Sequence, residues 1–146
     1  MSNGTSNNGT SKMEMRVTVS GEGDIVAARQ AARQMAIALG FGSVDQSRIA
    51  TAVSELVRNV VRYANGGRGE VLLHELPSTP RGVGIELVVA DDGPGIADLD
   101  LALHPGYTTG PGLGMGLPGT RRLMDETTID SSHGRGTTVT IRKWHR

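Results

Sequence analysis

The chain contains no cysteine among its 146 residues. This absence excludes disulfide bonds and thiolate metal sites. Charge of one sign is not in excess either, because 15 basic residues balance 15 acidic ones. A neutral chain is not expected to bind nucleic acid or an acidic membrane by general electrostatic attraction. Long apolar runs are also missing, and none approaches the roughly 20 residues of a membrane span.

The amino end has little that could pack into a core. Residues 1–12 are mostly Ser, Asn, Gly and Thr, without the apolar segment of a signal peptide. We therefore expect a disordered tail over residues 1–12 and a single domain over residues 13–146. Because neither a signal peptide nor a membrane span is expected, we expect a cytoplasmic location.

The spacing of apolar residues predicts both strands and helices. Residues 13–20 alternate between apolar and polar side chains, as in a half-buried strand, and residues 46–64 repeat apolar side chains at helical spacing. Asp24 and Asp45 are expected to cap two helices, and Pro118 suits the first turn of a third. The expected helices span 24–39, 46–64 and a short stretch from about 118, and the expected strands span 13–20, 70–76, 83–90, 127–132 and 136–144.

These elements together predict one α/β (α+β) two-layer sandwich. Its sheet is expected to be mixed but mostly antiparallel, with the helices covering one face. Residues 91–117, between a strand and the last helix, are expected to form a long glycine-rich loop.

Three polar residues come together on the second expected helix. At about 100° per residue, Glu55, Asn59 and Arg62 lie within roughly 60° of one another. An Asn oxygen can bind Mg²⁺, a Glu carboxylate can accept a proton from an attacking hydroxyl, and an Arg can pair with a phosphate. The alternative is an ordinary solvated face, because charged residues three or four apart are common on helices.

A glycine run follows further along the chain. Gly110, Gly112, Gly114 and Gly116 occupy every second position, with apolar residues between them. Glycine lets the backbone approach a ligand closely, and a run of free N–H groups can cradle phosphate oxygens. The alternative is a flexible linker, but a linker does not need Leu and Met at alternate places.

Two shorter segments complete the set. Asp91 follows an apolar strand and can accept a hydrogen bond from the amine of adenine, while Gly93 and Gly95 let the chain turn around a flat base. The segment 134–138 contains Thr137, whose hydroxyl can join a water network around the base. The alternatives are an Asp-Gly turn for the first segment and a simple hairpin turn for the second.

In this order the four segments resemble the GHKL ATPase superfamily, whose nucleotide site is the Bergerat fold, and the resemblance covers nearly all of residues 13–143. It implies ATP and Mg²⁺ as cofactors. It also implies Glu55 as the catalytic base or water-positioning residue, Asn59 as the magnesium ligand and Asp91 as the partner of the adenine amine. The other residues that it implies at the nucleotide are Arg62, Tyr63, Gly93, Gly95, Ile96, Thr108, Thr109, Gly110, Gly112, Leu113, Gly114, Met115, Gly116, Leu117 and Thr137.

Within the superfamily, the runs 49–59 and 112–125 are most similar to the RsbT-type switch serine/threonine kinases of bacterial partner-switching systems. This resemblance implies phosphorylation of a STAS-domain scaffold or antagonist protein, as in the stressosome, and a switch to a PP2C-type phosphatase or another output module. One alternative is an anti-sigma factor that binds a sigma factor directly and phosphorylates its antagonist. A nucleotide sensor that transfers no phosphate is the third hypothesis.

One departure concerns positive charge near the phosphates. Residues 96–120 contain no Lys or Arg, although electrostatic stabilisation supplies much of the rate in phosphoryl transfer. The charge must come from Mg²⁺, Arg62, backbone N–H groups or the pair Arg121–Arg122. We therefore expect slow turnover in the absence of a partner protein.

Overall fold

The computed structural model describes residues 12–63, 68–93, 113–131 and 136–146, with the backbone alone for residues 63 and 113–117. Its strands form one sheet in the order β1-β2-β3-β5-β4, and each of the four pairings is antiparallel. The strands are β1 (Glu14–Val19), β2 (Gly69–Thr79), β3 (Gly82–Asp91), β4 (Glu126–Ser131) and β5 (Thr137–His145).

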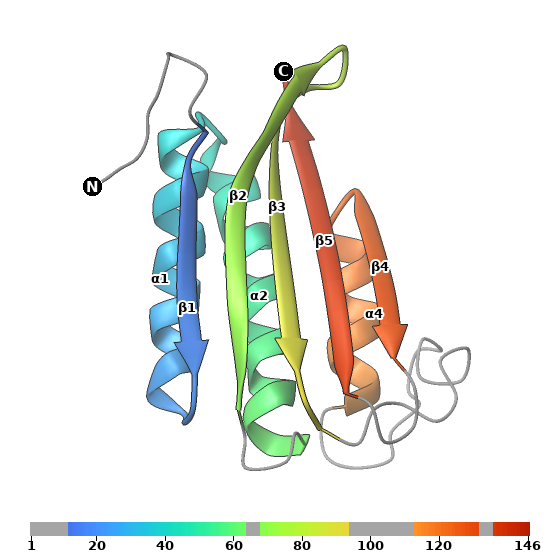
Figure 1. Ribbon diagram of the computed structural model, residues 1–146. Coiled ribbons are helices and arrows are strands. Elements are labelled where there is room, and N and C mark those ends of the chain that lie inside the picture. The colour runs from blue at the N-terminus through green and yellow to red at the C-terminus, as the bar shows by residue number, and fades with distance from the viewer. Residues whose placement is uncertain (1–11, 64–67, 94–112, 132–135) are drawn as a thin grey trace.

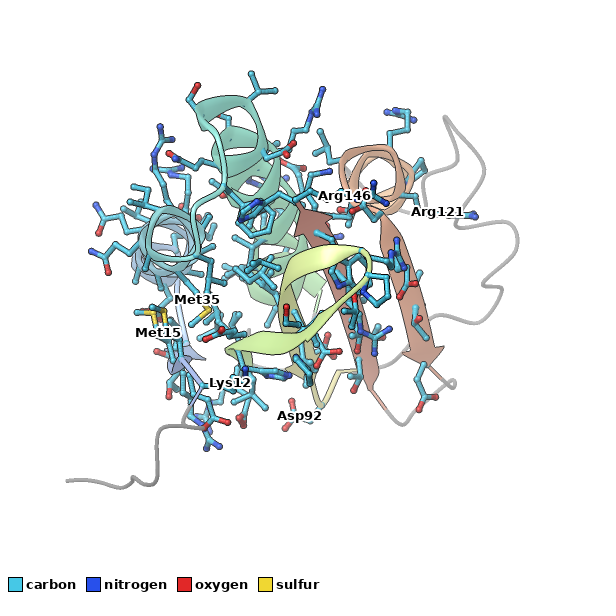
Figure 2. All side chains as sticks on the ribbon, turned by 90° about the horizontal axis from the view of Figure 1, so that it is seen from above. Lys12, Met15, Met35, Asp92, Arg121 and Arg146 are labelled. Atoms are coloured by element: carbon cyan, nitrogen blue, oxygen red, sulfur yellow. The ribbon has the colours of Figure 1, made fainter. Side chains whose placement is uncertain are left out.

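Helices cover one face of this sheet (Figure 1). They are α1 (Gly23–Ala38), α2 (Ser43–Tyr63) and α4 (Leu113–Leu123). Seen along the strands, the helices lie side by side on that face, and no helix of the described ranges covers the other (Figure 2). The two-layer sandwich predicted from the sequence is confirmed, with a described sheet that is antiparallel throughout instead of mixed. Among the described helices, none is long and apolar enough to cross a membrane.

The core lies between the sheet and the helices α1 and α2. Odd-numbered side chains of the central strands point to the helices because strand residues alternate between faces, and they are buried. Each fully buried aliphatic side chain contributes about 1.5–3 kcal/mol of transfer free energy. The central core residues are Val71, Leu73, Ile85, Leu87, Val89, Val139 and Ile141 of the sheet and Ile49, Val53, Leu56, Val57 and Val60 of α2.

The first two helices begin slightly earlier than the sequence predicted. Asp24 lies in the first turn of α1, with Glu22 at the N-cap position, and its Oδ2 accepts hydrogen bonds from the backbone N–H of Ser20 at 2.8 Å and of Gly21 at 3.2 Å. Asp45 likewise lies in the first turn of α2 and not at its cap. Both carboxylates still favour the helix start, where the macrodipole is positive.

The start of α4 differs more from expectation. The helix begins at Leu113, and Pro118 lies inside it, so the prediction that Pro118 begins the helix is wrong. Residues 113–117 of the glycine run are helical instead of looped. Glycine costs about 1 kcal/mol per residue in a helix relative to alanine. Packing of α4 against α2 must therefore stabilise a segment whose own propensity is poor.

Four elements meet at one end of the sandwich, which we call the lower end after its place in Figure 1. The second half of α2, the end of β3, the start of β5 and the start of α4 all lie there. The opposite, upper end contains the start of α2, the end of α4 and the end of β5.

Candidate functional site

A row of four small or polar residues closes the helix-facing side of the sheet at the lower end. Asp91 pairs with Gly69 on one side and with Thr137 on the other, and Thr137 pairs in turn with Ser131. Paired residues of an antiparallel sheet lie on the same face. Because Val89 and Val139, two positions away, are buried under the helices, this row continues the buried face to its edge.

Asp91 is the charged member of this row. Its Oδ1 accepts a hydrogen bond from the backbone N–H of Gly93 at 2.8 Å. Burial raises the pKa of the Asp91 carboxyl above its usual value of 3.8, and the charge of Asp92 adds to this, whereas the backbone N–H groups of Gly93 and Thr137 oppose it. Within the described ranges no cation forms an ion pair with Asp91. A half-buried carboxylate of this kind can accept a further hydrogen bond from an N–H donor.

Glycines hold the backbone closely around Asp91. A Cβ at Gly69 would lie 2.4 Å from the carbonyl oxygen of Ala90 and 2.9 Å from Cγ1 of Val60. A Cβ at Gly136, where φ is 86°, would lie 2.3 Å from the carbonyl oxygen of Asp91. Larger residues would therefore displace the strand end that carries the carboxylate. Gly136 belongs to a predicted segment, whereas Gly69 was not singled out.

Two members of this row, Thr137 and Ser131, carry hydroxyl groups. The Oγ of Ser131 and the Oγ1 of Thr137 are 2.8 Å apart, and the Oγ of Ser131 also donates to the carbonyl oxygen of Gly136 at 3.0 Å. Thr137 was predicted as a site residue, and the structure pairs it with Asp91 across β3 and β5. Ser131 was missed, and only the pairing of residue 131 with residue 137 across a hairpin could have indicated it.

The second half of α2 lies over this row. Val60 approaches Gly69 so closely that a side chain there would collide with it, so Asn59 is at the same end of the molecule as Asp91. Glu55 and Asn59 are half-buried, whereas Arg62 is exposed. The Oε2 of Glu55 accepts a hydrogen bond from Nη1 of Arg58. For Tyr63 the backbone closes α2.

Glu55 faces the side of α2 against which α4 packs. Arg48 and Thr51 of α2 and Leu123 of α4 line one shared groove of about 400 Å³. Glu55 follows Arg48 by seven residues, which is about two helical turns, so it continues the same stripe toward the lower end. Because α4 runs in the direction opposite to α2, its start lies beside that half of α2 (Figure 1).

The first turn of α4 contributes backbone donors. The first four N–H groups of a helix have no partner inside it, and the positive end of the helix dipole lies there. Such an end binds phosphate readily. Five of the predicted nucleotide residues belong to this part of α4, namely Leu113, Gly114, Met115, Gly116 and Leu117. Six others, Gly95, Ile96, Thr108, Thr109, Gly110 and Gly112, lie outside the described residues.

Asn59 provides the oxygen that suits a magnesium ion at this place. Among the described residues no group of three or more His, Asp or Glu side chains could hold a metal. Mg²⁺ does not require one, because it keeps several waters and binds substrate phosphates together with one or two protein oxygens. The half-buried Asn59 on α2, at the same end of the molecule as the start of α4, could offer one amide oxygen to such an ion.

Comparison with known proteins identifies the family. Residues 44–145 match the family described as histidine kinase-, DNA gyrase B-, and HSP90-like ATPase. The chain belongs to this family. The superfamily that the sequence resembles is thereby confirmed.

Two curated relatives and one solved structure narrow the comparison. This chain is 45% identical over 130 residues to the serine/threonine-protein kinase RsbT of Bacillus subtilis (strain 168). The alignment covers 89% of this chain and 96% of that protein. It is 36% identical over 102 residues to an anti-sigma F factor of Halalkalibacterium halodurans, or 68% of this chain and 69% of the other. The mycobacterial sensor histidine kinase MprB superposes with a TM-score of 0.56 at 17% identity, covering 91% of this chain and 97% of that chain. This last likeness concerns the fold alone.

Proposed function

We propose that the chain is an ATP-dependent protein serine/threonine kinase. The observation that carries the proposal is the half-buried Asp91, which has no cation beside it in the described ranges and lies at the same end of the molecule as Glu55 and Asn59. Membership of an ATPase family supports nucleotide binding. The 45% identity to a serine/threonine-protein kinase over most of both chains supports the reaction type.

Each residue then has a distinct role in the transfer. Asp91 accepts a hydrogen bond from the adenine amine, next to the hydroxyl groups of Thr137 and Ser131. The N–H groups at the start of α4 bind phosphate oxygens, and Asn59 offers its amide oxygen to Mg²⁺, which when bound neutralises phosphate charge.

Glu55 accepts the proton that the acceptor hydroxyl loses during the transfer. The acceptor hydroxyl oxygen forms a bond to the γ-phosphorus of ATP while the bond from that phosphorus to the bridging oxygen breaks. ADP leaves with that oxygen, and the hydroxyl proton moves to the carboxylate of Glu55 directly or through one water. Arg62, which is exposed on the same stripe of α2, supplies positive charge to the transferred group.

The acceptor that we propose is a Ser or Thr of a STAS-domain scaffold or antagonist protein in the cytoplasm. After phosphorylation the kinase leaves this partner, because the new phosphate adds charge at the contact, and binds a PP2C-type phosphatase or another output module. A second candidate is direct binding of a sigma factor. It is favoured by the 36% identity to an anti-sigma F factor over about two thirds of the chain.

The test of the reaction is transfer of labelled phosphate from ATP to purified STAS-domain proteins. Glu55→Ala should lower the transfer rate by about 10²–10⁴-fold, the usual contribution of a general base, while calorimetry still detects ADP. Glu22→Ala, which removes an exposed carboxylate at the start of α1, is the matched control and should transfer normally. Retained transfer in Glu55→Ala would remove Glu55 from its role, and no heat with ADP or ATP in the wild type would overturn the nucleotide site.

A pull-down separates the two partner classes. The wild-type chain with ADP and Mg²⁺ is offered a STAS-domain protein and a sigma factor from the same organism. Retention of the STAS-domain protein alone supports the switch kinase, and retention of the sigma factor supports the second candidate.

A further inference from the structure

An ion pair on α2 occupies the carboxylate that the proposed mechanism needs. Oε2 of Glu55 accepts a hydrogen bond from Nη1 of Arg58 three residues later. The two side chains are 35% and 32% exposed, so a protein docked on this surface can reach both. No other ion pair of Arg58 occurs within the described ranges.

The pair draws Glu55 away from the magnesium and phosphate side. At about 100° per residue, Asn59 lies about 40° to one side of Glu55 around the helix and Arg58 about 60° to the other. A carboxylate that turns toward Arg58 therefore turns from Asn59. In this arrangement one of the two oxygens that could accept the acceptor's proton is already hydrogen-bonded.

The surface around this pair carries an excess of positive charge. In the second half of α2, which carries the pair, Arg58 and Arg62 are the basic residues and Glu55 is the acidic one. Arg58 is partly exposed and Arg62 is exposed. An acidic protein surface complements such a patch.

We propose that Arg58 is a positioning residue that holds Glu55 in a resting orientation, and that a carboxylate of the protein substrate takes over Arg58 and frees Glu55. The inference rests on the proposed kinase function and adds to it a feature of the substrate, an acidic residue close to the acceptor hydroxyl. It also gives a physical reason for the slow turnover that we expect without a partner. The chemical step is unchanged, and only the partner of the guanidinium changes.

The first test measures hydrolysis of Mg·ATP without any partner. Arg58→Gln keeps a polar side chain but removes the charge, so Glu55 is no longer held and hydrolysis should rise about two- to five-fold, the factor that a partly exposed ion pair is worth. Arg48→Gln is the matched control, because Arg48 forms an ion pair of the same spacing with Asp45 at 3.0 Å on the same helix. The control should hydrolyse ATP at the wild-type rate.

The second test measures binding and involves no turnover. The partner is the unphosphorylated form of a STAS-domain protein that the wild type phosphorylates. With ADP and Mg²⁺ present, calorimetry should show that Arg58→Gln binds it about five-fold more weakly, whereas Arg58→Lys and Arg48→Gln bind within two-fold of wild type. Unchanged hydrolysis and unchanged affinity in Arg58→Gln would overturn the inference and leave the kinase function standing. If the wild type phosphorylates no STAS-domain protein, the proposed function fails first. In that case, the rate of ATP hydrolysis by Arg58→Gln without a partner is the measurement that decides whether Arg58 holds Glu55.

Discussion

A buried charge and a half-buried charge at opposite ends of the same sheet have different surroundings. At the upper end, Nζ of Lys143 donates to the carbonyl oxygen of Leu123 at 3.0 Å and lies 3.6 Å from Oδ1 of Asp125 and 3.8 Å from Oδ1 of Asp45. At the lower end, Asp91 has no cation within ion-pair distance among the described residues, and burial raises the pKa of its carboxyl.

The difference lies in how each charge is compensated inside the chain. Burying an ion is costly unless it is paired and hydrogen-bonded. Lys143 meets this condition inside the chain, where it joins the end of α4 to β5 and to the start of α2. Asp91 has backbone N–H partners but no cation beside it among the described residues, so the cost of its charge is offset only in part inside the chain. We infer that the upper end fixes the helices in place and that the lower end remains ready for the nucleotide.

Asp91→Asn should have the largest effect on nucleotide binding. The variant should bind ADP about ten- to a hundred-fold more weakly, because a hydrogen bond to a charged acceptor is worth about 1.5–3 kcal/mol. Its free energy of unfolding without nucleotide should be equal to or higher than that of the wild type, since a desolvated charge is removed. Calorimetry measures the first quantity and denaturant unfolding the second.

The neighbouring residue offers a matched control for that variant. Asp92 is exposed, and Asp92→Asn should change ADP affinity by less than two-fold. If Asp91→Asn destabilised the protein without nucleotide and left ADP affinity intact, Asp91 would be a structural charge like Lys143, and the comparison would fail.

Lys143→Met should have the opposite profile. Methionine fills a similar volume but cannot donate to the Leu123 carbonyl or neutralise Asp125, so the free energy of unfolding should fall by about 2 kcal/mol. ADP affinity should stay within two-fold of wild type, because Lys143 lies at the far end of the sheet. Lys12→Met removes an exposed positive charge and is expected to leave stability unchanged. A large loss of ADP affinity in Lys143→Met, with stability intact, would contradict the division between the two ends.

Most of the fold was predictable from the sequence because its signals are local. The helical spacing of Ile49, Val53, Leu56 and Val60 predicts α2 and its buried stripe, and all four side chains are buried in the core. The start of α4 was not predictable in this way. Its glycine-rich first half has poor helix propensity, and Pro118 resembles a first-turn residue. Packing against α2 overrides both tendencies, and a sequence pattern does not contain that contact.

The site was predictable to the extent that its residues lie within recognisable segments. Glu55, Asn59, Asp91 and Thr137 belong to such segments, and the structure places them at one end of the molecule. The roles assigned to them remain predictions. Ser131 was not found, because its place beside Thr137 depends on which residues pair across β4 and β5. The ion pairs of Lys143 join elements that are distant in sequence, and no local pattern contains them.

A weaker effect is expected from pH, which should change nucleotide binding and stability in opposite directions. The pKa of Asp91 is raised in the folded protein. Its contribution to stability is therefore fully present below the usual value of 3.8 and is lost as the pH rises through the folded-state value. Nucleotide binding needs the charged carboxylate, so ADP affinity should instead fall as the pH drops from 7 through that same value, by less than about ten-fold for each pH unit. Calorimetric titrations of the wild type and Asp91→Asn at matched pH values isolate the effect, because the variant lacks the titrating group and the ligand's own protonation cancels. Equal pH dependence in both proteins would show that the adenine amine does not bind this carboxylate.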